Sequence, residues 1–252
     1  MHDYTERFDE FKRRYTIFTK LSDHKQKALE RILANVKECK TKSLLDVGAG
    51  DGALSIPLST KFGKVVAIDK NPVLTEALRR NGISAITSRW EDVQLEKSFD
   101  VVLASHFLYY IEPRLRKRAV QKMYESLSPG GKLILIVNKE DDDFHGLLFK
   151  VAAGLPKPNA IAIMREKEAM EVIRSSVNEE AIIEQIDGRL LVPMELLHGL
   201  CELFLNVEAS EYEKIKPSVE KEAKAFMRKE GMLDFTISDL MFTITKPAQI
   251  DR

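Results

Sequence analysis

Residues 44–52, with the sequence Leu-Leu-Asp-Val-Gly-Ala-Gly-Asp-Gly, constrain the fold of this chain more than any other stretch. Leu44, Leu45 and Val47 are typical of the end of a buried parallel strand, and Ala53 begins a segment that favours a helix. The glycines between them tolerate positive φ and allow a ligand to approach the backbone. The sequence therefore predicts a strand, a tight turn and a helix that together present several backbone N–H groups at one place.

The spacing of the glycines leaves two kinds of cofactor open. Gly48, Gly50 and Ala53 fit a loose dinucleotide-binding fingerprint. Asp46, at the mouth of the turn, favours another cofactor, because its carboxylate would repel a pyrophosphate. The same carboxylate suits a ligand that carries an ammonium group and a sulfonium, such as S-adenosylmethionine (SAM).

Residues 46–52 resemble the first motif of the class I SAM-dependent methyltransferases. In that family the glycine turn wraps the methionine moiety, and the acid before the turn contacts the ammonium group directly or through water. The resemblance implies that the cofactor is SAM. It also implies that the following residues contact it: Asp46, Gly48, Ala49, Gly50, Asp51 and Gly52.

The order of apolar segments predicts an α/β fold, with a Rossmann-like, seven-stranded, mostly parallel sheet, helices on both faces and an antiparallel last strand. This order is similar to the sheet of the same family. The expected strands are 44–47, 65–68, 83–86, 99–104, 132–137, 181–192 and 235–245. The expected helices are 3–19, 23–36, 53–61, 72–81, 113–127, 144–153, 165–175, 193–205 and 211–230.

We expect a single domain with three parts. Residues 1–42 would form N-terminal helices that cover the cofactor site, residues 43–140 the SAM-binding core, and residues 141–252 the rest of the sheet with a helical substrate lid. The apolar stripe of the first helix, which includes Tyr15 and Phe18, has two interpretations: it packs on the domain, or it lies over the cofactor.

Asp69 follows the predicted strand 65–68 and lies about twenty residues after the glycine turn, where an acid reaches a ribose in such folds. One carboxylate can accept hydrogen bonds from both ribose hydroxyls. We therefore expect Asp69, with its neighbour Lys70, in the cofactor site. The alternative for Asp69 is a surface aspartate before a turn at Asn71.

Residues 88–92 correspond to the loop that holds the adenine in the resembled family. An acid such as Glu91 can accept from the exocyclic amine, and an aromatic neighbour such as Trp90 can cover the ring. Many family members carry an Asp-Ala-like pair where this chain has Arg89 and Trp90. Trp90 could equally pack at the strand end.

Residues 105–110, Ser-His-Phe-Leu-Tyr-Tyr, lie at the tip of the predicted strand 99–104, where catalytic loops gather in parallel sheets. They are similar to the fourth methyltransferase motif, which borders the transferred methyl group. We expect Ser105 to contact the cofactor, and His106 to contact cofactor or substrate or to accept a proton as the catalytic residue. The alternative is that the His106 side chain only makes hydrogen bonds within the loop.

Residues 138–143, Asn-Lys-Glu-Asp-Asp-Asp, follow the fifth strand. The acids could cap the next helix, or they could form an anionic rim for a cationic amine. Apolar residues close behind them, among them Phe144 and Phe149, would line an acceptor pocket in the lid.

The amino-acid composition limits which partners and which cellular location we expect. The chain has 39 basic and 39 acidic side chains and a formal net charge of zero, so we expect no nucleic-acid substrate. Cys39 and Cys201 match no metal or redox spacing, which favours reduced thiols in the cytoplasm and no metal. Residues 1–14 are too charged for a signal peptide, and no apolar run is long enough to span a membrane. The oligomeric state is not predicted.

The resemblance implies methyl transfer from SAM to a small-molecule acceptor. Residues 105–111 and the long helical region before the last strand look like small-molecule methyltransferases, including the histamine-type N-methyltransferases, which favours an amine nitrogen. Transfer to a hydroxyl or to a protein side chain remains open. A regulatory protein that binds SAM without turnover also remains open.

Overall fold

The structure is a computed structural model that describes residues 8–155, 166–205, 207–228 and 231–249. The chain forms two compact units. The first, which we call the helical unit, takes the described parts of residues 1–27, 139–163 and 187–239. The second, which we call the sheet unit, takes residues 28–138 and the described parts of 164–186 and 240–252.

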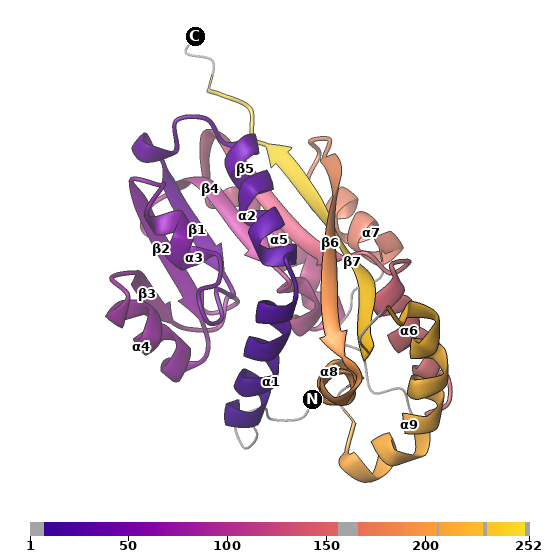
Figure 1. Cartoon of the computed structure of the whole chain (residues 1–252). Helices are drawn as coiled ribbons and strands as arrows, with labels where there is room; N and C mark the ends of the chain where they lie inside the picture. The colour runs from indigo at the N-terminus through magenta and orange to yellow at the C-terminus, as the bar shows by residue number, and fades with distance from the viewer. Residues whose placement is uncertain (1–7, 156–165, 206, 229–230, 250–252) are drawn as a thin grey trace. The chain divides into compact units, whose positions relative to one another are not determined.

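Seven strands form one sheet in the described part of the chain, in the order β3-β2-β1-β4-β5-β7-β6. The pairs β1–β2, β2–β3, β1–β4 and β4–β5 are parallel, and β7 runs against its neighbours (Figure 1). The predicted sheet is confirmed. Its strands are β1 (Ser43–Val47), β2 (Lys64–Asp69), β3 (Ser84–Thr87), β4 (Phe99–Ser105), β5 (Leu127–Asn138), β6 (Ile182–Pro193) and β7 (Met232–Thr245).

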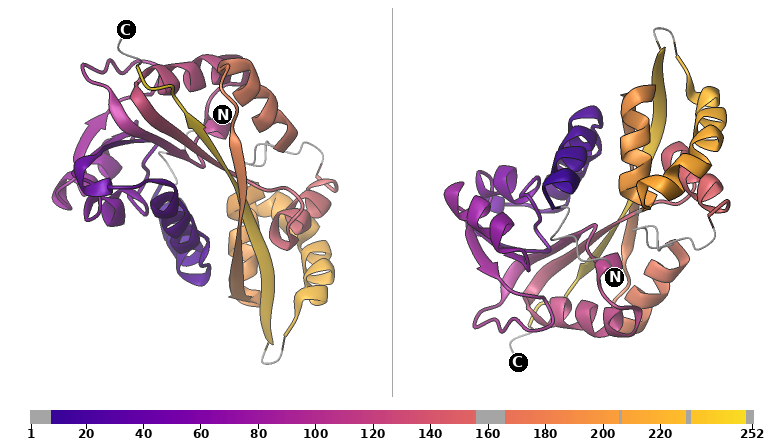
Figure 2. Two further views of the ribbon diagram at one scale, coloured as in Figure 1. Left: turned by 90° about the horizontal axis from the view of Figure 1, so that it is seen from above. Right: turned by 90° about the horizontal axis from the view of Figure 1, so that it is seen from below.

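Alternation along the strands builds a core on each face of the sheet unit, because successive side chains point to opposite faces. Leu44 of β1 packs with α2, α3 and α4, whereas Leu45 packs with α5 and α7. Figure 2 shows these helices on the two sides of the sheet. The helices are α2 (His24–Asn35), α3 (Ser55–Ser59), α4 (Pro72–Arg80), α5 (Pro113–Glu125) and α7 (Glu166–Ser176).

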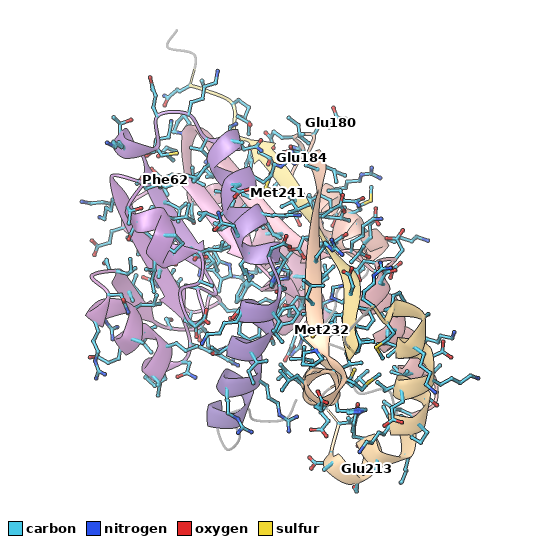
Figure 3. The ribbon with its side chains drawn as sticks, viewed as in Figure 1. Phe62, Glu180, Glu184, Glu213, Met232 and Met241 are labelled. Carbon is cyan, nitrogen blue, oxygen red and sulfur yellow. The ribbon has the colours of Figure 1, made fainter. Side chains whose placement is uncertain are left out.

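Helix α2 is also tied to the edge strand β6. Glu184, labelled in Figure 3, accepts hydrogen bonds from Arg31 and Asn35 of α2, each at 2.8 Å. An uncovered edge strand could pair with another chain, so these contacts shield the end of the sheet.

Two local predictions are wrong. The fifth strand was expected to begin at residue 132, after a helix that ends at residue 127, but residues 128–131 lie within β5, and the register between β4 and β5 shifts between Phe99 and Val101. Backbone bonds with Lys246 hold this segment: Gly130 N–H donates to the Lys246 carbonyl and Lys246 N–H to the Gly131 carbonyl. Helix α3 spans only Ser55–Ser59, because the glycine turn extends to Leu54.

The helical unit has its own core, which joins four helices to parts of β6 and β7. Phe18 of α1 packs against Phe144 and Phe204, with ring centroids 6.1 and 4.9 Å away, and the structure thus shows the packing role of the first helix. Residues 3–7 of that predicted helix lie outside the described residues. The helices are α1 (Phe8–Leu21), α6 (Asp143–Ala152), α8 (Met194–Leu205) and α9 (Ala209–Ala223).

The acidic run before α6 caps that helix. Asp142 is buried and accepts from the His145 backbone N–H at 2.7 Å, and Asp143 accepts from Thr236. The capping alternative is therefore confirmed for Asp142, whose buried carboxylate is used within the protein. Phe144 is misassigned to an acceptor pocket, since its side chain is fully buried in the core of the helical unit.

Candidate cofactor site

The glycine turn lies at the carboxyl ends of β1 and β2. Gly48, Gly50 and Gly52 have φ values of +75°, +58° and +84°, a region that disfavours every residue with a Cβ. The backbone N–H groups of Gly48 and Ala49 both donate to the carbonyl of Ile68 at the end of β2, at 2.8 and 3.0 Å. The turn is thus fixed to the neighbouring strand.

The three glycines differ in what surrounds them. A Cβ at Gly48 would lie 2.2 Å from Cδ2 of Phe107, and one at Gly52 would lie 2.5 Å from Cδ2 of Leu78. A Cβ at Gly50 would meet nothing within 4 Å. Gly48 and Gly52 are therefore required by packing within the protein, whereas no neighbouring atom of the protein excludes a side chain at Gly50.

Asp69, the last residue of β2, supports this turn directly. Its Oδ2 accepts from the Gly50 N–H at 3.0 Å and its Oδ1 from the Asn71 N–H at 2.8 Å. Each carboxylate oxygen has a second lone pair that could accept a ribose hydroxyl. Lys70, beside it, is exposed. The acid predicted to bind the ribose therefore lies against the predicted cofactor turn.

Asp46 is buried in β1, and its Oδ2 accepts a 2.5 Å hydrogen bond from the hydroxyl of Ser55 at the start of α3. Asp51 is exposed on the turn and accepts from the Ala53 N–H at 3.2 Å. Ser55 was not predicted, because no local sequence pattern shows that its hydroxyl faces Asp46.

Trp90 packs inward. Its side chain is 2% exposed, and its indole N–H donates to the Ala119 carbonyl of α5 at 3.1 Å. Of the two interpretations of Trp90, the structure thus shows the one in which it packs at the strand end. The buried ring offers almost no surface to an adenine. Glu91, predicted to face the adenine, is half-buried, and its Oε1 lies 3.6 Å from Nη2 of the exposed Arg89.

Lys122 of α5 holds the loop that contains these residues. Its ammonium donates to the carbonyls of Trp90, Glu91 and Val93 at 2.6, 3.1 and 2.6 Å, and it lies 4.7 Å from the Trp90 ring centre. Burial lowers the pKa of Lys122, although the carboxylates of Asp92 and Glu91 oppose the shift. Sequence reasoning missed this residue because the bonds join positions about thirty apart.

The loop after β4 borders the same edge of the sheet. Ser105 ends β4 and is half-buried. His106 has a left-handed φ of +54°, its backbone N–H donates to the Ile136 carbonyl at 2.8 Å, and its Nδ1 lies 3.4 Å from Oδ1 of Asn138. Because Phe107 covers Gly48, this loop and the glycine turn are in contact. The structure thus brings the loop that contains His106 into contact with the predicted cofactor turn through Phe107.

Comparison with known proteins identifies the central part of this architecture. Residues 44–131 match the model of a methyltransferase domain, and this segment contains the glycine turn, Asp69 and His106. This segment is a methyltransferase domain. SAM is accordingly the cofactor of the domain, and the open backbone at Gly50 beside Asp69 fits a ligand of this kind.

A curated relative matches part of the chain. The carboxy-S-adenosyl-L-methionine synthase of Yersinia enterocolitica is 26% identical over 153 residues, which are 55% of this chain and 57% of the relative. The chain thus spans little more than half the length of that relative.

Two solved structures share the fold of nearly the whole chain. A protein from Bacillus halodurans C-125, provisionally named a methyltransferase, has a TM-score of 0.62 at 16% identity, covering 87% of this chain and 99% of that one. A SAM-dependent methyltransferase from Thermotoga maritima, provisionally assigned to histamine N-methylation, has a TM-score of 0.60 at 14% identity, covering 96% and 97%. At these identities the likeness concerns the fold alone.

Two searches of the described residues gave negative results. None of the helices described is long and apolar enough to cross a membrane. Among the same residues, no three His, Cys, Asp or Glu side chains gather in a group that could hold a metal ion.

Proposed function

We propose that this protein transfers a methyl group from SAM to the amine nitrogen of a small molecule. The observation that carries the proposal is the glycine turn, in which a Cβ at Gly50 would meet nothing within 4 Å and Asp69, the acid expected to bind the ribose, accepts the backbone N–H of Gly50. In such a reaction the protein mainly aligns a nucleophile with the methyl group, and positioning can supply much of the reduction of the barrier.

The choice of an amine rests on His106. A protonated amine has no lone pair for attack, so it must lose a proton before methyl transfer. An imidazole is a side chain suited to that task, and His106 belongs to the loop whose Phe107 packs against Gly48. The provisional assignment of the Thermotoga maritima protein to histamine N-methylation also favours an amine acceptor.

Other acceptors are distinguished by experiment. A hydroxyl or a protein side chain could take the methyl group in place of an amine. The name of the Yersinia enterocolitica relative raises a further alternative, in which SAM itself is modified. A protein that binds SAM without turnover would form no product with any acceptor.

The test is incubation of the purified protein with methyl-labelled SAM and a panel of small amines, small alcohols and peptides. We expect S-adenosylhomocysteine and a labelled amine, both detected by mass spectrometry. Three other results would contradict the amine proposal and identify the corresponding alternative. These are label found only in alcohols or peptides, a modified SAM, and the absence of any product although SAM binds.

We further propose that the helical unit acts as the substrate lid and determines the acceptor. The motifs that resemble the cofactor site all precede residue 138, and the chain enters the helical unit directly after β5. Amide hydrogen exchange tests this proposal. The acceptor should slow exchange within α6, α8 or α9, whereas SAM alone should slow it at residues 48–52 and 69–71. Protection by the acceptor confined to the sheet unit would refute the assignment.

A further inference from the structure

Arg116 of α5 is a buried cation. Its side chain is 10% exposed, whereas that of Arg114 on the same helix is 81% exposed. Taking a guanidinium group out of water is costly unless hydrogen-bond acceptors and an opposite charge surround it. The groups around Arg116 must therefore supply these acceptors.

Three of the acceptors are backbone carbonyls of one short segment, the loop that follows β4. The Nε–H of Arg116 donates to the carbonyl oxygens of Leu108 and Ile111, at 3.1 and 3.0 Å. Nη2 donates to the Tyr109 carbonyl at 3.5 Å. The short helix η2 (Leu108–Tyr110) is therefore held by a single side chain of α5.

Glu168 of α7 supplies the opposite charge. Its carboxylate forms an ion pair with Nη1 of Arg116, and its side chain is 43% exposed. This arrangement leaves Nε and Nη2 to the loop carbonyls, because the planar guanidinium presents its donors in fixed directions. Since α5 and α7 also pack together in the sheet unit, Arg116 joins both helices to the loop.

The same loop contacts the glycine turn. Phe107, directly before η2, packs so closely on Gly48 that a Cβ at Gly48 would lie 2.2 Å from its ring. We propose that Arg116, paired with Glu168, is a positioning residue for methyl transfer, which holds residues 107–111 against the cofactor turn. Fixed geometry around the reacting groups can supply much of the reduction of the barrier. The consequence for transfer rests on the proposed function, whereas the holding of the loop does not.

Amide hydrogen exchange of the intact protein tests the holding role without any substrate. The backbone N–H groups of Tyr110 and Ile111 close the turn of η2, by donating to carbonyls within the loop at 3.0 and 3.1 Å. Both should exchange about tenfold or more faster in Arg116→Met, because the loop opens more often. Exchange in β1 and β2 should stay unchanged, since only a general loss of stability would raise it there.

Matched variants make the result specific. Arg114→Met removes an exposed arginine of the same helix, which pairs with Glu112, and should leave exchange in the loop unchanged. Arg116→Lys keeps the charge but loses the planar group that reaches several carbonyls, so it should speed exchange less than Arg116→Met does. It takes the place of Arg116→Met if that variant fails to fold. Unchanged loop exchange in the folded Arg116 variant, or equal acceleration throughout the sheet unit, would overturn the proposal.

Kinetics test the consequence for the reaction. With the amine that takes the label, Arg116→Met should lower kcat about tenfold or more, and Arg116→Lys less, while the SAM affinity stays within about threefold. Faster loop exchange with unchanged kcat, or a loss of SAM affinity as large as the loss of kcat, would overturn the role in positioning. Faster loop exchange in Arg116→Met when the wild type methylates no acceptor would instead contradict the proposed function, so the two failures are distinguishable.

Discussion

At the scale of single residues, the three glycines of the turn have positive φ values in common but differ in their surroundings. Phe107 lies where a Cβ of Gly48 would be, and Leu78 where a Cβ of Gly52 would be, whereas nothing lies within 4 Å of the corresponding point at Gly50. Asp69 connects this open residue to Asn71 through one hydrogen bond from each backbone. The carboxylate thus has a structural role in the turn in addition to its proposed role in binding ribose.

Asp69→Ala should weaken SAM binding about ten- to a hundredfold, because charge-assisted hydrogen bonds to the ribose contribute about 1.5–3 kcal/mol. Calorimetric titration with SAM measures the effect. Asp100→Ala is the matched control, since Asp100 also accepts two hydrogen bonds, from the N–H and the hydroxyl of Ser43, but does so near the start of β4. Equal SAM affinity in folded Asp69→Ala and Asp100→Ala would remove Asp69 from the site.

At the scale of elements, helix α5 determines the shape of the loop after β3. Lys122 donates all three ammonium hydrogens to backbone carbonyls of residues 90–93. This loop corresponds to the one that we expect to hold the adenine. The half-buried ammonium of Lys122 therefore couples the packing of α5 to the geometry of the proposed adenine site.

Lys122→Met should lower the free energy of unfolding by about 2 kcal/mol, because three half-buried carbonyls would lose their charged donor. The loosened loop should also weaken SAM binding several-fold. Lys117→Met is the control, because Lys117 lies on the same helix with an exposed side chain. Urea unfolding and SAM titration of both variants check the prediction, and identical behaviour of the two would contradict it.

The sequence predicted these elements well where periodicity or a motif was strong. The strand before the glycine turn, α4 with Pro72 at its first turn, and the position of Asp69 all agree with the structure. It failed where distant residues decide. The bonds of Gly130 and Gly131 to Lys246, and those of Lys122 to residues 90–93, join segments that no local pattern connects. Likewise, an apolar pattern could not show that Phe144 is a core residue rather than a pocket residue.

At the scale of the whole molecule, the chain has one core on each face of the sheet and a separate core in the helical unit. In the helical unit, β6 and β7 are joined by a buried carboxylate. Asp234 of β7 accepts from Arg189 of β6 and from Arg228, and the hydrogen bonds from Arg189 lower its pKa although burial opposes the shift.

The contacts of Asp234 with Arg189 and Arg228 should make the free energy of unfolding decrease as the pH falls. Since the folded pKa of Asp234 is lowered, its contribution is complete above the ordinary carboxyl pKa of about 3.9 and is lost as the pH falls through the folded value. Asp234→Asn should therefore cost about 1 kcal/mol at neutral pH, because both guanidinium groups remain in contact with water. The difference from the wild type should shrink below about pH 4.

Urea unfolding of both proteins from neutral to acidic pH measures this difference. Asp141→Asn is the control, because Asp141 pairs with Lys139 on the surface and should contribute little at any pH. A constant difference between wild type and Asp234→Asn at every pH would contradict the assignment of the shift to the folded ion pair.

The central claim is that the open glycine turn holds SAM, and calorimetric titration of the wild type, Gly50→Val and Gly82→Val with SAM tests it most directly. Gly82 also has a positive φ, of +78°, and open space around it, but it lies at the end of α4, so its replacement controls for backbone strain. We predict that the wild type and Gly82→Val bind SAM with similar affinity, that folded Gly50→Val does not bind it, and that NAD binds to none of the three. SAM binding to Gly50→Val at the wild-type affinity, or a wild type that binds NAD and not SAM, would contradict the claim.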